Sequence, residues 1–216
     1  MRNKYTYLLM DLDGTVTDPM EGITRGVQYA LASLGVDVQD RRLLCPFIGP
    51  PLKASFQEFY HLNEEDTTRA IAKYREYFST QGIFENEMYE GMEAFLQTQQ
   101  AAGKQLVLAT SKPEPFALRI LDYFQLTPYF TFVGGSSLDN GRTEKEEVIR
   151  YILDSLAISD LSSAIMIGDR KFDIEGAHAN GLQAIGVLYG YGSREELERA
   201  GADYLAADLA ELSRLV

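Results

Sequence analysis

The spacing of apolar residues changes along the chain and divides it into two parts. Between residues 19 and 84, apolar side chains such as Ile23, Val27 and Leu31 recur every three or four positions, which predicts amphipathic helices and no strand. From Gly91 onward, short apolar runs alternate with segments of helical spacing. That alternation predicts a parallel sheet with helices on both faces. We therefore expect an α/β fold with a Rossmann-like core and an inserted helical domain.

The same change of pattern sets the expected boundaries. A first strand at residues 5–10 precedes the helical part, so the core is expected at residues 1–16 and 86–216 and the helical cap at residues 17–85. In the cap we expect about four helices, with a break at residues 45–51. After it we expect helices at 92–102, 114–124, 143–156, 173–180 and 193–200 and from 208, alternating with strands at 105–110, 129–133, 164–167, 183–187 and 202–205.

Composition restricts the partners more than it restricts the fold. The chain has 216 residues, 45% of them hydrophobic, enough for one sizeable core and a smaller module. Its formal charge of −12 argues against nucleic-acid polymers and anionic membranes as partners. Cys45 has no second cysteine with which to form a disulfide, and no secretory signal or membrane-length apolar stretch is apparent. We therefore expect a cytoplasmic protein, either a monomer or a homodimer.

Two acids directly follow the first expected strand. Asp11 and Asp13 flank one apolar residue and precede Gly14 and Thr15. Side chains two positions apart on an extended chain point to the same side. Both carboxylates are therefore expected at the carboxyl end of a strand, where open α/β sheets bind their ligands. Such a pair is costly unless a cation lies beside it. The alternative is a strand-ending turn, in which Asp, Gly and Thr are all common.

A hydroxyl-bearing segment follows the strand expected at residues 105–110. Thr110, Ser111 and Lys112 precede Pro113, and proline is favoured in the first turn of a helix. A hydroxyl and free N–H groups at such a position can hold a phosphoryl oxygen. A hydroxyl that only caps the next helix explains Thr110 equally well. We expect Ser111 and Lys112 to line the substrate side of the site.

Lys145 lies where another helix is expected to begin. A turn signal at Asn140-Gly141 leads to Thr143, a suitable N-cap. A lysine in the first turn is electrostatically unfavourable because that end of a helix already carries positive charge. An anion opposite Lys145 would explain the residue. A solvent-exposed lysine among the three neighbouring glutamates is the alternative.

A second pair of acids follows the strand expected at residues 164–167. Asp169 comes directly after Gly168, and Asp173 follows four residues later. Hard cations such as Mg²⁺ take oxygen ligands. Asp11 and Asp169 would supply carboxylates, and the backbone carbonyl of Asp13 would supply a third oxygen. We expect Asp173 to support these ligands from behind; an acid placed to favour the start of a helix is the alternative.

Taken in this order, the motifs resemble those of the haloacid dehalogenase-like phosphatases. The segment from Asp11 to Asp18 is similar to the first motif of that family, and the segments around Thr110, Lys145 and Asp169 are similar to its later motifs. The resemblance covers nearly the whole chain. It departs at Lys145, which is followed by glutamate where many relatives have proline.

The resemblance implies a Mg²⁺-dependent phosphomonoester hydrolase with a helical cap and a small phosphorylated metabolite as its partner. In that family, the residue at the position of Asp11 attacks phosphorus, and the residue at that of Asp13 acts as acid and base. Thr110 would hold the transferred phosphoryl group, and Lys145 matches the lysine of the third motif. The cap segment around Lys53 is similar to the specificity segment of the family, so Lys53 is the expected cap contact to the substrate.

Several functions are compatible with these motifs. Arg170-Lys171 and the loop from Tyr189 to Gly192 resemble the 5′-nucleotidase-like branch near the phosphoglycolate phosphatases. We favour nucleoside 5′-monophosphates, because aromatic side chains can stack on a base, over phosphoglycolate; tyrosines that only pack in the core are the alternative. A sugar-phosphate mutase or phosphotransferase using Asp11 and a non-catalytic phosphate-binding module are further alternatives. A dehalogenase is less favoured, because its chemistry needs neither Asp13 nor a metal.

Overall fold

The larger unit of the molecule is built on a parallel sheet. The computed structural model describes residues 4–138 and 141–216. Six strands are hydrogen-bonded in the order β5 (Phe130–Ser136), β4 (Gln105–Pro113), β1 (Tyr7–Met10), β6 (Ala164–Gly168), β7 (Gln183–Val187) and β8 (Tyr204–Ala206), and all five pairings are parallel.

The central strand β1 determines where the functional residues gather. Its residues Leu8, Leu9 and Met10 are fully buried, as expected for a parallel strand covered on both faces. Met10 lies opposite Leu108 of β4 and Ile167 of β6. The three strands therefore end at one edge. Because β4 follows on one side of β1 and β6 on the other, this edge is the switch point at which doubly wound sheets bind ligands.

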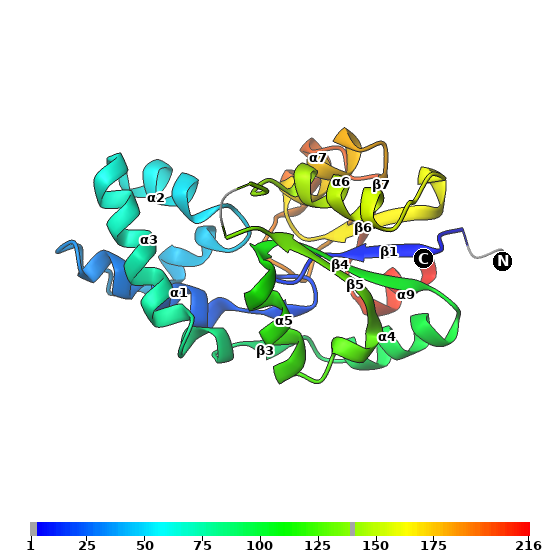
Figure 1. Ribbon diagram of the computed structural model, residues 1–216, viewed down its shortest axis with the longest axis horizontal. Coiled ribbons are helices and arrows are strands. Elements are labelled where there is room, and N and C mark those ends of the chain that lie inside the picture. The colour runs from blue at the N-terminus through cyan, green and yellow to red at the C-terminus, as the bar shows by residue number, and fades with distance from the viewer. Residues whose placement is uncertain (1–3, 139–140) are drawn as a thin grey trace. The chain divides into compact units, whose positions relative to one another are not determined.

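Helices cover both faces of this sheet, as the alternating pattern predicted. Figure 1 shows α6 (Lys145–Ser155) and α7 (Lys171–Ala179) on one face. The opposite face carries α4 (Met92–Ala101), α5 (Glu114–Tyr123) and α9 (Leu209–Leu215), and α8 (Arg194–Arg199) packs against α7. None of the helices in the described part of the chain is long and apolar enough to cross a membrane.

The smaller unit is helical. Its α-helices are α1 (Met20–Ala32), α2 (Leu52–Tyr60) and α3 (Glu64–Phe78), and 3₁₀ turns occupy Arg41–Phe47 and Gly82–Phe84. Helix α1 packs against α3, where Gly26 allows the Tyr74 ring to approach: a Cβ on Gly26 would lie 2.9 Å from that ring. The expectation of about four helices becomes three α-helices and two 3₁₀ turns. Proline at position 46 suits a short 3₁₀ turn better than a long helix.

Two short strands lie where the chain passes between the units. The strands β2 (Thr17–Asp18) and β3 (Glu87–Met88) pair with each other. The compact units comprise Met1–Thr17 with Met88–Val216, and Asp18–Glu87; the predicted boundaries were 1–16 with 86–216, and 17–85.

The start of α6 differs from the prediction. The N-cap is Glu144 and not Thr143, because the carboxylate of Glu147 accepts the backbone N–H of Thr143 at 2.7 Å and that of Glu144 at 3.0 Å. The Glu147 carboxylate thus satisfies backbone donors where the chain enters the helix, in place of the expected threonine hydroxyl. The turn predicted at Asn140-Gly141 lies partly outside the described residues.

Candidate active site

The carboxyl edge of the sheet brings together side chains from three strands. Asp11 directly follows β1, Thr110 lies in β4, and Asp169 directly follows β6. The backbone N–H of Asp11 donates to the carbonyl of Ile167 at 2.9 Å and continues the strand pairing into the site. All three side chains are buried. The in-register pairing of parallel strands is thus what places these distant segments side by side.

Lys145 connects two of the acids. Its Nζ lies 2.9 Å from Asp11 Oδ1 and 2.8 Å from Asp173 Oδ1, and it donates to the carbonyl of Ala109 at 2.8 Å. Burial disfavours its charge, but the two carboxylates outweigh that effect and raise the pKa of Lys145. The side chain is 3% exposed, so the alternative of a solvent-exposed lysine is wrong. The anions opposite the start of α6 are carboxylates of the protein itself.

A second buried ion pair involves Asp13. The Nζ of Lys112 lies 2.9 Å from Asp13 Oδ2. Burial raises the pKa of Asp13, and the charge of Lys112 opposes that shift. Asp13 Oδ1 is buried and forms no hydrogen bond within the described part of the chain. The two oxygens of this carboxylate therefore have different surroundings.

Asp169 is enclosed by backbone. The N–H of Tyr191 donates to its Oδ2 at 2.7 Å. A Cβ on Gly14, whose φ is +84°, would lie 2.2 Å from Asp169 Oδ2, and a Cβ on Gly190 would lie 2.3 Å from Asp169 Cβ. Burial, followed by the charges of Asp173 and Asp11, raises the pKa of Asp169 well above its usual range. Glycine is needed at both positions because any side chain would displace this carboxylate.

Three of the acids could hold a metal ion. Carboxylate oxygens of Asp11, Asp169 and Asp173 lie within 4.8 Å of one another. Together with Asp13, they form four buried carboxylates that face only two buried ammonium groups, on Lys112 and Lys145. With all four carboxylates ionised the formal charge of this group is −2, and with Asp13 protonated it is −1; a divalent cation would offset the excess negative charge in both cases. Oxygen ligands of this kind suit hard cations. Sequence reasoning expected the carbonyl of Asp13 among the ligands and Asp173 behind them; the cluster brings the Asp173 carboxylate to the same place.

Three further residues were predicted to contact the phosphoryl group or the rest of the substrate: Thr110, Ser111 and Lys53. Thr110 Oγ1 accepts the backbone N–H of Lys112 at 3.2 Å, so its own hydrogen is available to a ligand. Ser111 is half-buried. Lys53 belongs to the helical unit, where its Nζ lies 2.6 Å from Glu64 Oε1, and the lysine side chain is 57% exposed.

The tyrosines after β7 support the first motif. The Tyr189 hydroxyl donates to the carbonyl of Thr15 at 3.1 Å, and its ring packs edge-on against Tyr89. Packing therefore explains Tyr189, and Tyr191 contributes its backbone to Asp169. Sequence reasoning missed this supporting role. The signal that could have revealed it is the pair of glycines at 190 and 192, directly after an apolar strand.

This arrangement is suited to phosphoryl transfer. It provides a carboxylate with a lysine beside it, a second carboxylate that can exchange a proton, and a hydroxyl at a strand end. These are the groups that covalent and acid–base catalysis require.

Known proteins are similar to this chain in both sequence and fold. The sequence profile of the haloacid dehalogenase-like hydrolases matches residues 8–187. A protein of Pseudomonas aeruginosa named 5′-nucleotidase is 44% identical over 213 residues, which cover 99% of this chain and 96% of that protein. The tyrosine-protein kinase PtkA of Mycobacterium tuberculosis is 32% identical over 95% of this chain and 70% of its own length.

A solved structure agrees with these matches. The crystal structure of a protein described as a predicted phosphatase from Clostridium acetobutylicum has a TM-score of 0.95 and 50% identity, and the alignment covers 98% of this chain and 97% of that one. The fold, the buried acids at the sheet edge and these similarities lead to one conclusion: the chain belongs to the haloacid dehalogenase-like hydrolases and is a phosphatase of that family.

Proposed function

We propose that this protein hydrolyses nucleoside 5′-monophosphates in two steps, with the phosphoryl group carried on Asp11 between them. The observation that carries the proposal is the environment of the Asp11 carboxylate. It is buried at the carboxyl end of β1, its Oδ1 lies 2.9 Å from Lys145 Nζ, and Asp13 lies two residues further along the chain. A side-chain carboxylate held in this way can act as a nucleophile toward phosphorus.

The proposed metal is Mg²⁺, bound by the carboxylates of Asp11 and Asp169 and the backbone carbonyl of Asp13, with Asp173 supporting the site. The excess negative charge of the buried cluster and its oxygen donors support this choice. Bound there, Mg²⁺ would supply positive charge to the transferring phosphoryl group.

In the first step, an oxygen of Asp11 attacks phosphorus and the bond from phosphorus to the nucleoside oxygen breaks. Asp13 gives its proton to that departing oxygen. In the second step, a water attacks the phosphorus and passes a proton to Asp13, and the bond from phosphorus to Asp11 breaks. The products are a nucleoside and inorganic phosphate, and both aspartates return to their initial states. The Thr110 hydroxyl donates to a phosphoryl oxygen during both transfers, and the charge of Lys145 offsets the negative charge that gathers there.

Two observations favour a nucleotide over phosphoglycolate. The carboxylate of phosphoglycolate would require a nearby cation, but Lys112, the buried lysine that follows Thr110 and Ser111, is already paired with Asp13. The 44% identity over nearly the full length of a protein named 5′-nucleotidase points the same way. Ser111 and Lys53 remain the proposed substrate contacts outside the phosphoryl site.

The test compares kcat/KM for several nucleoside 5′-monophosphates with that for phosphoglycolate, in the presence of Mg²⁺. This ratio measures discrimination between substrates. We expect at least one nucleotide to be preferred. A preference for phosphoglycolate of tenfold, about 1.4 kcal/mol of transition-state stabilisation, would reject the nucleotide assignment and leave the phosphatase intact. Asp11→Asn serves as the inactive control.

Phosphotransfer to another acceptor is tested in the same preparation. Because one relative is named a tyrosine-protein kinase, the reaction is repeated with ATP and a tyrosine-containing peptide. Hydrolysis predicts inorganic phosphate as the product and incorporation of one oxygen from isotopically labelled water. A phosphorylated peptide in place of phosphate would assign the protein to phosphotransfer.

A further inference from the structure

Lys112 forms a buried ion pair within the protein, whereas a lysine that only binds substrate needs no such partner. Its Nζ lies 2.9 Å from Asp13 Oδ2, and the two side chains are only 5% and 11% exposed. A buried pair of this kind keeps its geometry, because separating the two charges would leave each of them buried without a counter-charge. Lys112 therefore constrains Asp13 before any substrate arrives.

The two carboxylate oxygens of Asp13 have different surroundings, which indicates a different role for each. Oδ2 is held by Lys112, whereas Oδ1 is buried and, within the described part of the chain, has no hydrogen-bond partner. A buried polar atom without a partner is costly unless a ligand completes it. We infer that Lys112 is a positioning residue, which holds Asp13 Oδ2 so that Oδ1 faces the reacting oxygens and exchanges the proton with them. This inference rests on the proposed phosphatase mechanism and assigns atoms within it.

The local backbone explains how Lys112 reaches Asp13. The pairing of β4 with β5 is regular at Ala109 and shifts register before Pro113, so Lys112 lies in an irregular part of the strand. Such irregularities change the direction in which a side chain points. The N–H of Lys112 donates to Thr110 Oγ1 at 3.2 Å, which fixes the backbone there. The other buried lysine of the site, Lys145, is bonded to Asp11, Asp173 and a carbonyl.

The atoms balance in both steps. In the first, the proton on Asp13 Oδ1 moves to the departing oxygen as its bond to phosphorus breaks, and the new carboxylate is stabilised by the charge of Lys112. In the second, a proton of the attacking water moves to Oδ1 as the bond between phosphorus and Asp11 breaks. Lys112 takes part in neither proton transfer and touches neither substrate nor product.

Leaving groups of different basicity test this role. Butyl phosphate, phenyl phosphate and 4-nitrophenyl phosphate carry leaving groups that need a proton progressively less, and none has a remote charged group that a lysine could bind. The value of kcat/KM reports the step in which the leaving group departs. For Lys112→Met we expect kcat/KM to fall on the order of 10²-fold with butyl phosphate, as is typical when acid catalysis is lost. With 4-nitrophenyl phosphate we expect a change of less than about threefold.

Two further variants complete the experiment. In an Asp13→Asn background, Lys112→Met should cause little additional loss with butyl phosphate, because residues that act as a unit are not additive. Lys112→Arg, which keeps a positive charge, should restore part of the rate. Lys104→Met is the matched control: Lys104 is also buried, precedes the other end of β4 and donates to the carbonyl of Tyr5 at 2.6 Å. It should leave the dependence on leaving group unchanged.

Each outcome has one meaning. An equal loss with all three phosphates, or an additive loss in the Asp13→Asn background, overturns the positioning role. A loss with nucleotides that is absent with butyl phosphate would make Lys112 a substrate contact instead. If Lys112→Met does not fold, the same comparison is made with Lys112→Arg and Lys112→Gln, for which a uniform loss is again the contrary result. An inactive but folded wild-type protein would reject the proposed function itself.

Discussion

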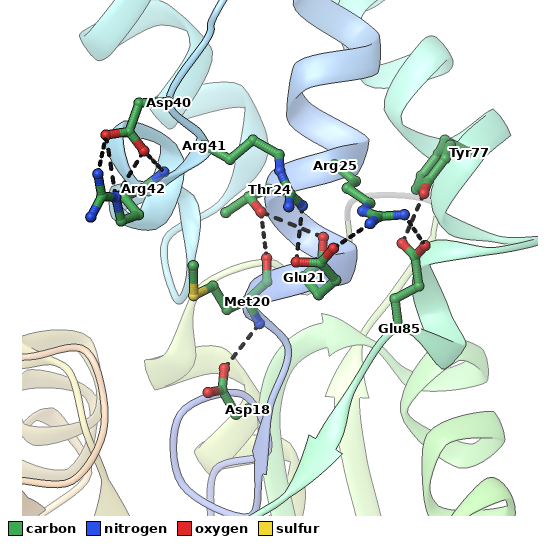
Figure 2. Close-up of polar contacts among 10 residues, drawn as sticks. All are labelled: Asp18, Met20, Glu21, Thr24, Arg25, Asp40, Arg41, Arg42, Tyr77 and Glu85. Carbon is green, nitrogen blue, oxygen red and sulfur yellow. Dashed lines mark hydrogen bonds and ion pairs between the residues drawn. The ribbon is translucent and has the colours of Figure 1, made fainter.

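The ion pairs of the helical unit differ in burial from those at the sheet edge of the α/β unit. In the helical unit, ion pairs lie at the surface, as in the group shown in Figure 2, where Glu21 is shared by Arg25 and Arg41 and Glu85 bonds Arg25 and Tyr77. The side chains of Arg25 and Glu21 are 45% and 43% exposed. In the α/β unit, Lys145 and Asp11 are 3% and 7% exposed. The α/β unit has exposed pairs as well, such as Arg150 with Glu146, but the pairs at its sheet edge are enclosed by protein and out of reach of solvent screening.

This difference in burial shows that the sheet edge of the α/β unit keeps charged side chains that lower the stability of the protein. An exposed pair contributes at most about 1 kcal/mol, and salt weakens it further. Buried charges are costly, and apolar residues of similar shape often stabilise a protein more than a buried pair does. The buried carboxylates at the sheet edge also outnumber the lysines beside them. Packing does not require such a group, whereas metal binding and phosphoryl transfer do.

The largest expected effect comes from removing the nucleophile in the buried group. Asp11→Asn keeps the shape of the side chain but abolishes the attacking carboxylate, so turnover should fall on the order of 10⁴-fold or more. Phosphate release and circular dichroism measure activity and fold. Wild-type rates from a preparation whose mass shows no deamidation to aspartate would remove Asp11 from the mechanism.

The next effect concerns the metal. Asp169→Ala should weaken the apparent affinity for Mg²⁺ by about 100-fold or more, because it removes a proposed metal ligand. Loss of a residue that only supports a ligand already costs about 10–100-fold in metal affinity. Titration of activity against Mg²⁺ in both proteins gives the affinities. Undiminished turnover of the wild-type protein in excess chelator would contradict a metal-dependent reaction.

A smaller effect should appear in stability, with the opposite sign. Without metal, Asp169 is a buried carboxylate that lies beside Asp11 and Asp173. Asp169→Asn should therefore stabilise the protein in chelator, because it removes the cost of burying this charge and its repulsion by the two neighbouring acids. A gain of about 1 kcal/mol raises Tm by about 2–4 °C for a chain of this size. Thermal unfolding with chelator and with Mg²⁺ measures it, and the gain should vanish or reverse with Mg²⁺. If Asp169→Asn has a lower Tm than the wild-type protein in chelator, the wild-type site is not destabilised by the charge of Asp169.

The smallest effect is expected from the exposed pairs of the helical unit. Lys53→Gln should change the free energy of unfolding by less than about 1 kcal/mol, because the pair with Glu64 is exposed. If Lys53 also contacts the substrate, KM should rise while Tm stays the same. Lys73→Gln is the matched control, since Lys73 forms a comparable exposed pair with Glu76 in the same unit. If both variants have the same KM and kcat, Lys53 does not contact the substrate and forms only a surface ion pair.

The sequence alone determined the architecture and the positions of the acids. Continuous apolar runs identified the buried strands, and Asp11 and Asp169 directly follow two of them. Because parallel strands end at the same edge, the local pattern was enough to predict that these carboxylates meet. Helical spacing between residues 19 and 84 likewise predicted the inserted unit, since periodicity is a local property of the chain.

Only the tertiary structure decided which charges pair. Nothing near Lys112 in the sequence indicates Asp13, and nothing near Tyr191 indicates that its N–H holds Asp169. These contacts depend on the strand order β4-β1-β6-β7 and on a register shift near the end of β4. Side chains far apart in the chain are brought within 3 Å or so by the summed packing of the whole sheet. A pattern within any one segment therefore cannot specify them.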